Sequence, residues 1–315
     1  EIKDNNEFVL PSGMITTDGT EANKLAIVTM RDNAIDKALK KKGKNVRVKD
    51  IGIERALGML GNPELVLFTS VEAHYSWKKM ASYLGLSADE TKTLLSDRDL
   101  RISVKLLEDG IADKLAHNQL VIGIVGTMGT TETGNIDDIS VLRKKANDND
   151  LWLHIDAAWG GPFCLVKGYG LEKKTKDMHL ADSITIDPHK MLYIPYNMGA
   201  FVLRNSENAH YVASDYEDGV IYATNSKSRR FDALKLWAAL RSIGIKNLTE
   251  MLEHDLAMTQ YAKQVVEQRR TFELMTPVEL NVMTLRYVPV KLKDELEAAI
   301  SMNNRKRIRE INQEL

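Results

Sequence analysis

Strand-like and helix-like segments alternate along this chain, and this alternation constrains the fold more than any other feature. Residues 120–128, LVIGIVGTM, are nearly all apolar, as expected of a strand buried on both faces of a sheet. A helical pattern follows at 137–149 and another strand-like stretch, LWLHID, at 151–156. Strand, helix, strand repetition with apolar strands predicts an α/β fold, with a mostly parallel sheet covered by helices.

The same reading assigns the rest of the chain. Further strands are expected at 64–70, 100–106, 181–187 and 199–205, and further helices at 21–42, 76–85, 108–118, 231–244 and 251–270. At 271–290, strand-like segments follow one another without helices between them. We therefore predict a large domain at 1–245 and part of a smaller α+β domain at 246–315. Neither end carries a start or stop signal, so we expect the native protein to extend beyond both.

Composition narrows the class of protein. A hydrophobic content of 43% supports a large core, and 43 Lys and Arg against 44 Asp and Glu give no basic excess that would point to nucleic acid. No apolar run approaches the ~20 residues of a membrane span. A single cysteine, Cys164, excludes an internal disulfide, which favours the cytoplasm. Its apolar neighbours, GPFCLV, predict a buried core thiol.

Polar residues follow several of the predicted strands. In a mostly parallel sheet the ligand binds beyond the carboxyl ends of the strands, so these residues are expected to form one site. The segments are TTDGTEAN (16–23), EAHYSW (72–77), GTTETGNID (129–137), HIDAAWGG (154–161) and DPHK (187–190). They have no zinc-ligand spacing, no dinucleotide fingerprint and no phosphate-loop motif. No metal site is predicted, and hydride transfer and nucleotide hydrolysis are disfavoured.

A lysine, an aspartate and a helix start at one site match the needs of pyridoxal 5′-phosphate (PLP). Lys190 follows a strand and offers an amine for a Schiff base, while Asp156 ends a buried strand and offers a carboxylate for the pyridine nitrogen. Gly19 and Thr20 open a helix whose N–H groups and dipole favour a phosphate. Each motif alone also fits an ordinary capped helix or a turn-forming aspartate.

Six segments in order resemble the group II PLP-dependent amino-acid decarboxylases, which include glutamate, aromatic amino-acid and tyrosine decarboxylases. The resemblance extends over roughly residues 10 to 290. It rests on TTDGTEANKLAIV (16–28), EAHYSWKKMASYLGLS (72–87), GTMGTTETGNIDDI (126–139), LWLHIDAAWGGP (151–162), ADSITIDPHKM (181–191) and RRFDALKLWAALRSIG (229–244). It implies the fold of type I PLP-dependent transferases, which is aspartate aminotransferase-like, and a homodimer with active sites at the subunit interface.

The resemblance also implies a role for each residue that matches a family motif. Lys190 is the implied Schiff-base lysine, and Asp156 the partner of the pyridinium nitrogen. Ala158 and His74 are implied to cover the two faces of the cofactor ring, and His74 to lie near the bond that breaks. The remaining implied cofactor contacts are Gly19, Thr20, Asp187 and His189 at the phosphate and Thr131 near Asp156 or the phenolic edge.

The implied reaction is decarboxylation of an L-amino acid to its amine and CO2 through a Lys190 Schiff base and a quinonoid. A tyrosine on a loop after the lysine strand is implied to donate the proton. Tyr216 is our candidate, with Tyr211 and Tyr222 as alternatives. The sequence does not select the amino acid, and glutamate, aspartate, aromatic amino acids and diaminobutyrate stay open.

Some residues depart from the family pattern. Asp18 stands where a small neutral residue is common, and its carboxylate would repel a phosphate unless it turns outward or an arginine offsets it. Asp187 stands where some members have asparagine. A substrate-binding arginine cannot be selected among Arg229, Arg230, Arg241 and Arg286.

Alternative functions remain open at this point. A carbon–carbon lyase acting on a phosphorylated amino alcohol has a similar lysine neighbourhood, and an aminotransferase shares the fold. A non-catalytic homologue that serves in binding or assembly is a third alternative. The histidine in EAHYSW and the helix at 229–244 favour the decarboxylase.

Overall fold

The computed structural model describes residues 2–4, 7–86, 91–94, 96–97, 99–213 and 230–314, with the backbone alone for 2–9 and 91–93. Within these residues, seven strands form a central sheet in the order β3-β9-β8-β7-β6-β4-β5. The neighbours from β5 to β8 pair in parallel, whereas β9 pairs antiparallel with β8 and β3. In this order the bounds are Ser12–Thr16, Gly199–Leu203, Ser183–Ile186, Trp152–Asp156, Leu120–Thr127, Leu65–Ser70 and Thr91–Leu94. The predicted mostly parallel α/β sheet is confirmed.

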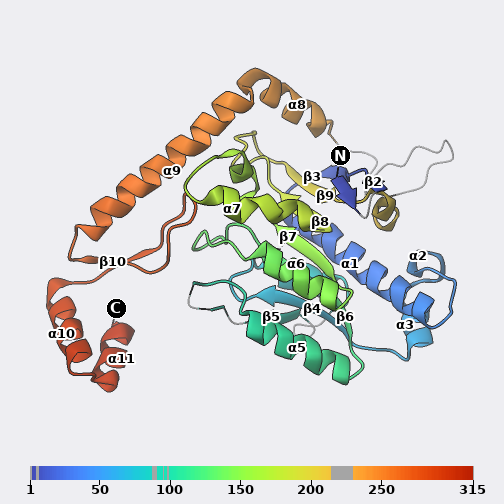
Figure 1. The fold of residues 1–315 in the computed structure, drawn as a ribbon, viewed down its shortest axis with the longest axis horizontal. Coiled ribbons are helices and arrows are strands. Elements are labelled where there is room, and N and C mark those ends of the chain that lie inside the picture. The colour runs from blue at the N-terminus through green and yellow to red at the C-terminus, as the bar shows by residue number, and fades with distance from the viewer. Residues whose placement is uncertain are drawn as a thin grey trace.

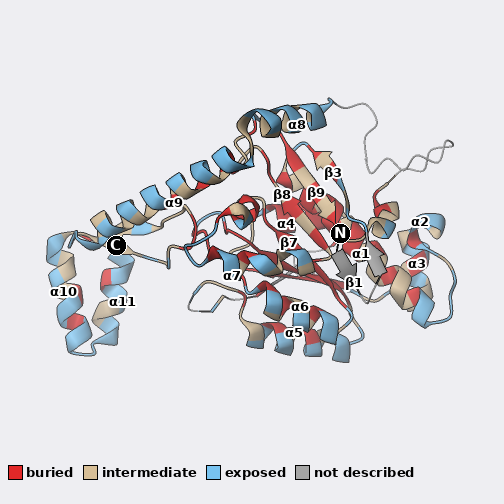
Figure 2. Cartoon of the chain, turned by 45° about the horizontal axis from the view of Figure 1, so that its top comes forward, coloured by how far each residue is buried: buried red, intermediate tan, exposed pale blue. Residues whose placement is uncertain are grey.

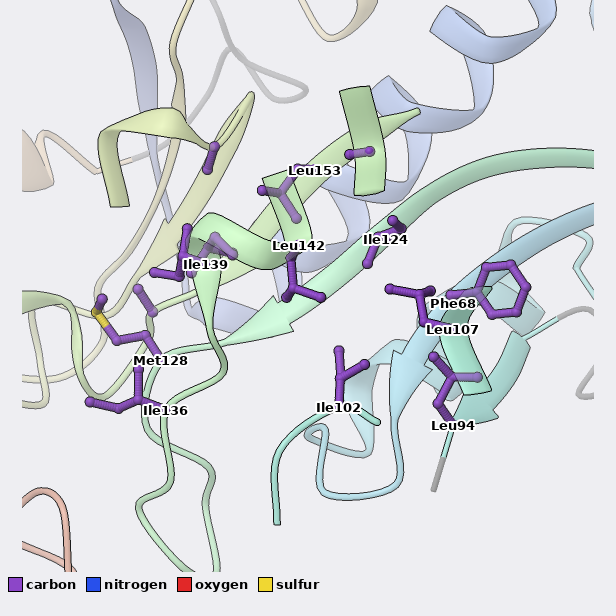
Figure 3. Packing of buried hydrophobic residues seen from close by; sticks show 14 of the residues in the cluster. Phe68, Leu94, Ile102, Leu107, Ile124, Met128, Ile136, Ile139, Leu142 and Leu153 are labelled. Atoms are coloured by element: carbon purple, nitrogen blue, oxygen red, sulfur yellow. The ribbon is translucent and has the colours of Figure 1, made fainter. Parts of the chain in front are cut away.

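Helices cover both faces of this sheet (Figure 1). Alternate residues of a strand point to opposite faces, and the core divides accordingly. Phe68 of β4 packs in one hydrophobic cluster with Leu107 of α5 and Leu142 of α6, as Figure 3 shows. Leu67, the preceding residue, packs in another cluster with Met30 of α1. The sheet is thus buried between two helical layers, which Figure 2 shows as red strands between helices with blue outer faces.

Helix α1 (Gly19–Lys41) shows why these segments become helices. Asp18 caps its start by accepting a 2.9 Å hydrogen bond from the Glu21 N–H, and Lys40 and Lys41 lie at its C-terminal end, where the helix dipole favours positive charge. The other helices of the domain are α2 (Val48–Ile51), α3 (Ile53–Leu60), α4 (Ser76–Tyr83), α5 (Val104–Ala116), α6 (Ile139–Asp148), α7 (Leu171–Thr175), η1 (Gly161–Leu165), η2 (Lys176–Leu180) and η3 (Ser206–Tyr211). A hairpin of β1 (Ile2–Asp4) and β2 (Glu7–Val9) precedes the sheet.

Two expectations from the sequence are wrong. Residues 100–106 are not a strand, because Leu100 has a left-handed backbone (φ 59°) and Ser103 caps α5, which begins at Val104. Ile102 contributes to the core from a loop, with an isolated bridge to Ser96. Cys164 is exposed and not a core thiol, because η1 turns the neighbouring Phe163 inward in its place.

The C-terminal part begins with α8 (Asp232–Ile243) and α9 (Ile245–Glu267), and α9 extends away from the sheet (Figure 1). It continues with the antiparallel pair β10 (Phe272–Leu274) and β11 (Leu285–Tyr287), then α10 (Val290–Ser301) and α11 (Arg305–Glu314). The loop between β10 and β11 returns to the large core, where Leu280 is buried. The domain boundary at 245/246 stays a prediction. None of the described helices is both long enough and apolar enough to cross a membrane.

Candidate active site

A cavity of about 340 Å³ lies where the parallel strands end. Its wall includes Thr127 at the end of β6, Asp156 at the end of β7 and Asp187 just after β8. The start of α1 and the loop after β4 complete this side. The volume is within the range of small-molecule and cofactor sites, and its position follows the crevice rule for α/β sheets.

Every residue predicted to contact the cofactor lines this cavity. These residues are Gly19, Thr20, His74, Thr131, Asp156, Ala158, Asp187, His189 and Lys190. They come from five segments that are up to 171 residues apart, between Gly19 and Lys190, and the fold brings them to one place. Their individual roles stay predictions.

Gly19 is required by the close approach of α1 to Asp187. A Cβ at position 19 would lie 2.8 Å and 2.9 Å from the two Asp187 carboxylate oxygens. Asp18, which was expected to repel an anion here, has its Oδ1 bound to the Glu21 N–H. An aspartate at this position is therefore explained by helix capping, although the residue also lines the cavity.

Asp156 is held by several donors at the end of β7, where it is 5% exposed. Its Oδ2 accepts hydrogen bonds from Asn23 Nδ2 at 2.9 Å and from Trp77 Nε1 at 3.0 Å. Its Oδ1 accepts from the backbone N–H of Ala158 at 3.2 Å. These three donors fix the orientation of the carboxylate in the cavity wall. Oδ1 keeps acceptor capacity for a ligand in the cavity.

Lys190, Asp187 and His189 form a cluster after β8. Lys190 Nζ lies 2.9 Å from Asp187 Oδ2, and the lysine side chain is 29% exposed. Burial raises the pKa of the Asp187 carboxyl above its ordinary value, although the positive charge of Lys190 acts in the opposite direction. His189 Nδ1 lies 2.5 Å from the carbonyl oxygen and 3.1 Å from the backbone nitrogen of Met198, and its Nε2 lies 3.8 Å from Asp187 Oδ2. An amine, a carboxyl and an imidazole thus meet at one strand end.

His74 follows β4 and is half-buried in the cavity wall. Burial lowers the pKa of His74 below its ordinary value, so its neutral form is favoured at neutral pH. Its Nδ1 lies 2.8 Å from Ser76 Oγ. The ring is therefore fixed at one edge by a side chain of α4.

Several lining residues were not predicted, namely Asn23, Thr127, Gly129, Trp159 and Val282. Asn23 could have been found, because it lies four residues after Gly19 and so on the same face of α1. Thr127 is the register partner of Asp156 on the neighbouring strand. Val282 comes from the loop between β10 and β11, and no local pattern in the sequence places that loop at the cavity.

The proton donor and the substrate arginine are not placed by the structure. Tyr216, Tyr222 and Arg229 lie outside the described residues. Tyr211 does not line the cavity, and its hydroxyl lies 3.3 Å from Asn33 Nδ2 of α1. Among the lining residues that the structure describes there is no arginine.

Comparisons with known proteins agree with this geometry. Residues 3–288 match the family model described as the pyridoxal-dependent decarboxylase conserved domain. The chain is 31% identical to an aspartate 1-decarboxylase of Aliivibrio fischeri, over 91% of this chain and 53% of the relative. It is 29% identical to an aromatic-L-amino-acid decarboxylase of Bacillus atrophaeus, over 78% of this chain and 53% of the relative.

A solved structure of mouse CSAD is similar in fold, with a TM-score of 0.77 and 28% identity over 92% of this chain and 59% of that one. The chain thus spans little more than half the length of the relatives it matches. PLP is the cofactor of this family, in agreement with the cofactor expected from the sequence. The match covers most of the chain, and the chain belongs to the pyridoxal-dependent decarboxylase family.

Proposed function

We propose that this chain provides the cofactor site of an enzyme that removes the α-carboxylate of an L-amino acid as CO2 and leaves the amine. The observation that carries the proposal is the single cavity that joins the Lys190 amine, the Asp156 carboxylate and the start of α1. The cavity wall also fits the group. Thr127 Oγ1 and Asp187 Oδ1 are buried there without a partner among the described residues, as expected of atoms that await a ligand.

Bound PLP supplies an aldehyde that condenses with amines and a ring that accepts the electron pair released when CO2 leaves. Lys190 would hold the aldehyde carbon, and Asp156 would keep the pyridine nitrogen protonated. Ala158 and His74 would cover the ring faces. The phosphate would be held by Gly19, Thr20 and His189, with Asp187 as a donor once its carboxyl has taken up a proton. Thr131 would contact the edge near Asp156.

The ion pair after β8 has a chemical use in this proposal. A lysine amine is a nucleophile only without its extra proton. Asp187 Oδ2, 2.9 Å from Lys190 Nζ, is positioned to accept that proton, and the raised pKa of Asp187 favours the transfer. The 29% exposure of the Lys190 side chain leaves the amine accessible to an incoming amino acid.

The finer parts of the proposal extend beyond the cavity. We place the protein in the cytoplasm and expect a homodimer, with Tyr216 as the proton donor. Phe231, Leu234 and Trp237 of the α8 segment are 74%, 50% and 61% exposed, and such an apolar surface supports a partner. Sedimentation of the full-length protein tests the dimer. Names of relatives suggest aspartate, diaminobutyrate and aromatic amino acids as substrates to try first.

The decisive experiment incubates the protein and PLP with the common amino acids and diaminobutyrate, and measures CO2 together with the matching amine. We expect both products from one substrate class, and neither from the Lys190→Ala variant. Lys37→Ala is the matched control, because the Lys37 side chain is 42% exposed and pairs with Asp150, and neither residue lines the cavity. A 2-oxo acid without CO2 would instead identify an aminotransferase, and an aldehyde from carbon–carbon cleavage a lyase. Failure to bind PLP would overturn the proposal altogether.

A further inference from the structure

Asn23 connects the two side chains that are proposed to grip the cofactor ring. One amide hydrogen of Nδ2 is directed to Asp156 Oδ2 at 2.9 Å, and the other to Ser76 Oγ at 3.1 Å. Ser76 Oγ lies in turn 2.8 Å from His74 Nδ1. Asn23 is 2% exposed and Ser76 is fully buried, so water does not replace these bonds. A continuous chain of hydrogen bonds therefore joins Asp156 to His74.

The chemistry of the partners fixes the direction of this chain. Asp156 Oδ2 accepts from Asn23 and Trp77, so the amide group of Asn23 must face it with nitrogen and not with oxygen. Asn23 Oδ1 accordingly is left without a partner among the described residues. Since both amide hydrogens are donors, Ser76 Oγ acts as an acceptor toward Asn23. The Ser76 hydroxyl hydrogen is then free to be donated to His74 Nδ1, and the described contacts give it no other acceptor.

The direction of the chain determines the tautomer of His74. A ring nitrogen that accepts the Ser76 hydroxyl carries no proton, so the neutral imidazole holds its proton on Nε2. The backbone N–H of Ser76, 3.4 Å from the same Nδ1, agrees with its acceptor role. Burial also lowers the pKa of His74, which keeps the ring neutral. Nε2–H is the donor that remains for a ligand.

We propose that Asn23 is a positioning residue that sets two properties together, the orientation of the Asp156 carboxylate and the Nε2–H tautomer of His74. Trp77, 1% exposed, supports the Asp156 side alone through its 3.0 Å hydrogen bond. Ser76 supports the His74 side alone. This inference rests on the proposed cofactor site, but the tautomer is a property of the chain without cofactor.

Substitutions can test the Asp156 side and the His74 side of this hydrogen-bond chain separately. Asn23→Asp is nearly isosteric, and a buried carboxyl beside Asp156 must take a proton, which it donates to Asp156. The protonated oxygen takes the place of Nδ2, which faces both Asp156 and Ser76, and its one hydrogen is used on Asp156. Ser76 must then donate to it and accept from Nδ1–H, so the tautomer of His74 reverses. Ser76→Ala removes the hydroxyl that fixes the His74 tautomer and leaves the hydrogen bonds of Asp156 in place. Trp77→Phe leaves the tautomer as it is and weakens PLP binding about tenfold, because a hydrogen bond to a charged group is lost.

The measurements are the ¹⁵N shifts of the histidine rings in the cofactor-free protein and the dissociation constant for PLP. The His74 signals are assigned from a His74→Gln variant. Thr29→Val is the matched control on the same helix, because Thr29 is fully buried and its hydroxyl donates only to Leu25 O among its described contacts. We expect this control to alter neither measurement.

Three results would overturn the inference. The first is a protonated His74 Nδ1 in the unchanged chain. The second is an Nδ1 that stays unprotonated in both Asn23→Asp and Ser76→Ala. The third is a Trp77→Phe variant that binds PLP as tightly as Thr29→Val. If Asn23→Asp does not fold, Ser76→Ala and Trp77→Phe still decide between these results. A protein that binds PLP without decarboxylating any amino acid contradicts the proposed reaction. The ¹⁵N shifts of the His74 ring test this inference independently of that outcome.

Discussion

Glu279 offers the sharpest test of how the C-terminal part is held to the cavity. Its side chain is only 4% exposed, and Oε1 contacts both Arg101 Nη2, at 2.6 Å, and Lys174 Nζ. Oε2 accepts the backbone N–H of Ile136 at 2.7 Å. Three residues later, Val282 reaches the cavity wall. The Glu279 carboxylate therefore fixes the β10–β11 loop to the large domain.

We predict that Glu279→Gln lowers the free energy of unfolding by about 2 kcal/mol at pH 7. Loss of one partner from a fully buried ion pair costs about 3–5 kcal/mol. The side chains of Arg101 and Lys174 are 30% and 33% exposed, so water recovers part of this cost. The glutamine oxygen can also still accept from Ile136. For these two reasons the predicted cost of about 2 kcal/mol lies below the cost of breaking a fully buried ion pair.

The pH dependence has a definite sign. Burial acts to raise the pKa of Glu279, but the bonds from Lys174, Ile136 and Arg101 outweigh it and hold the pKa below its ordinary value. The stabilisation is thus present above the unfolded pKa of about 4.5 and is lost as the pH falls through the folded pKa. The difference between Glu279→Gln and the unchanged protein should shrink over the same range.

Urea unfolding at a series of pH values measures both effects. Asp150→Asn is the control, because Asp150 also binds two cations, Lys37 and Lys41, but is 52% exposed. We expect the control to cost less than about 1 kcal/mol at pH 7. If Glu279→Gln costs no more than Asp150→Asn, burial of the Glu279 pair does not stabilise the fold and the reasoning is wrong.

Two further predictions concern the site, and a third concerns the buried His154 of β7. Lys190→Ala should lose the visible absorbance of the lysine-bound cofactor and the label fixed by borohydride, whereas retention of both would place the Schiff base at another lysine. Gly19→Ala should weaken PLP binding about tenfold in a fluorescence titration, because the new Cβ displaces Asp187; an unchanged affinity would show that α1 adjusts. His154 is fully buried, and burial lowers its pKa to about 4. The histidine of the unfolded chain therefore takes up a proton first, and the free energy of unfolding falls by ~3 kcal/mol between about pH 6.5 and pH 4. His154→Phe should remove this loss, as followed by thermal unfolding at pH 7 and pH 4.5, and an equal loss in the variant would contradict it.

The sequence predicts the cavity well because its wall is made of strand ends. A strand buried on both faces, such as β6, is recognisable from its apolar run, and the residue that follows such a strand must lie at the edge of the sheet. Lys190 and Asp156 are found by this reasoning without knowledge of any long-range contact. The resemblance of six segments adds the roles of these residues, which position alone does not supply.

Other parts could not be predicted, because they depend on backbone conformation or on contacts distant in sequence. The alternation of Leu100, Ile102 and Val104 is typical of a strand, but the left-handed conformation of Leu100 breaks it. Glu279 is 143 residues from Ile136 and 178 from Arg101, and its own sequence neighbours give no indication of either partner. The exposed position of Cys164 follows from the turn of a single short helix.

The cavity shows a difference between residues that face a ligand and residues that hold them in place. Lys190 must occur where a strand ends, so its position is fixed by secondary structure and can be read from the sequence. Asn23 contacts Ser76 and Asp156, which are 53 and 133 residues away, so its amide can bind both only after the chain has folded. An asparagine on a helix face has many ordinary explanations until that geometry is known. The chemistry of the site is thus visible in the sequence, whereas the hydrogen bonds that orient its side chains emerge only from the folded chain.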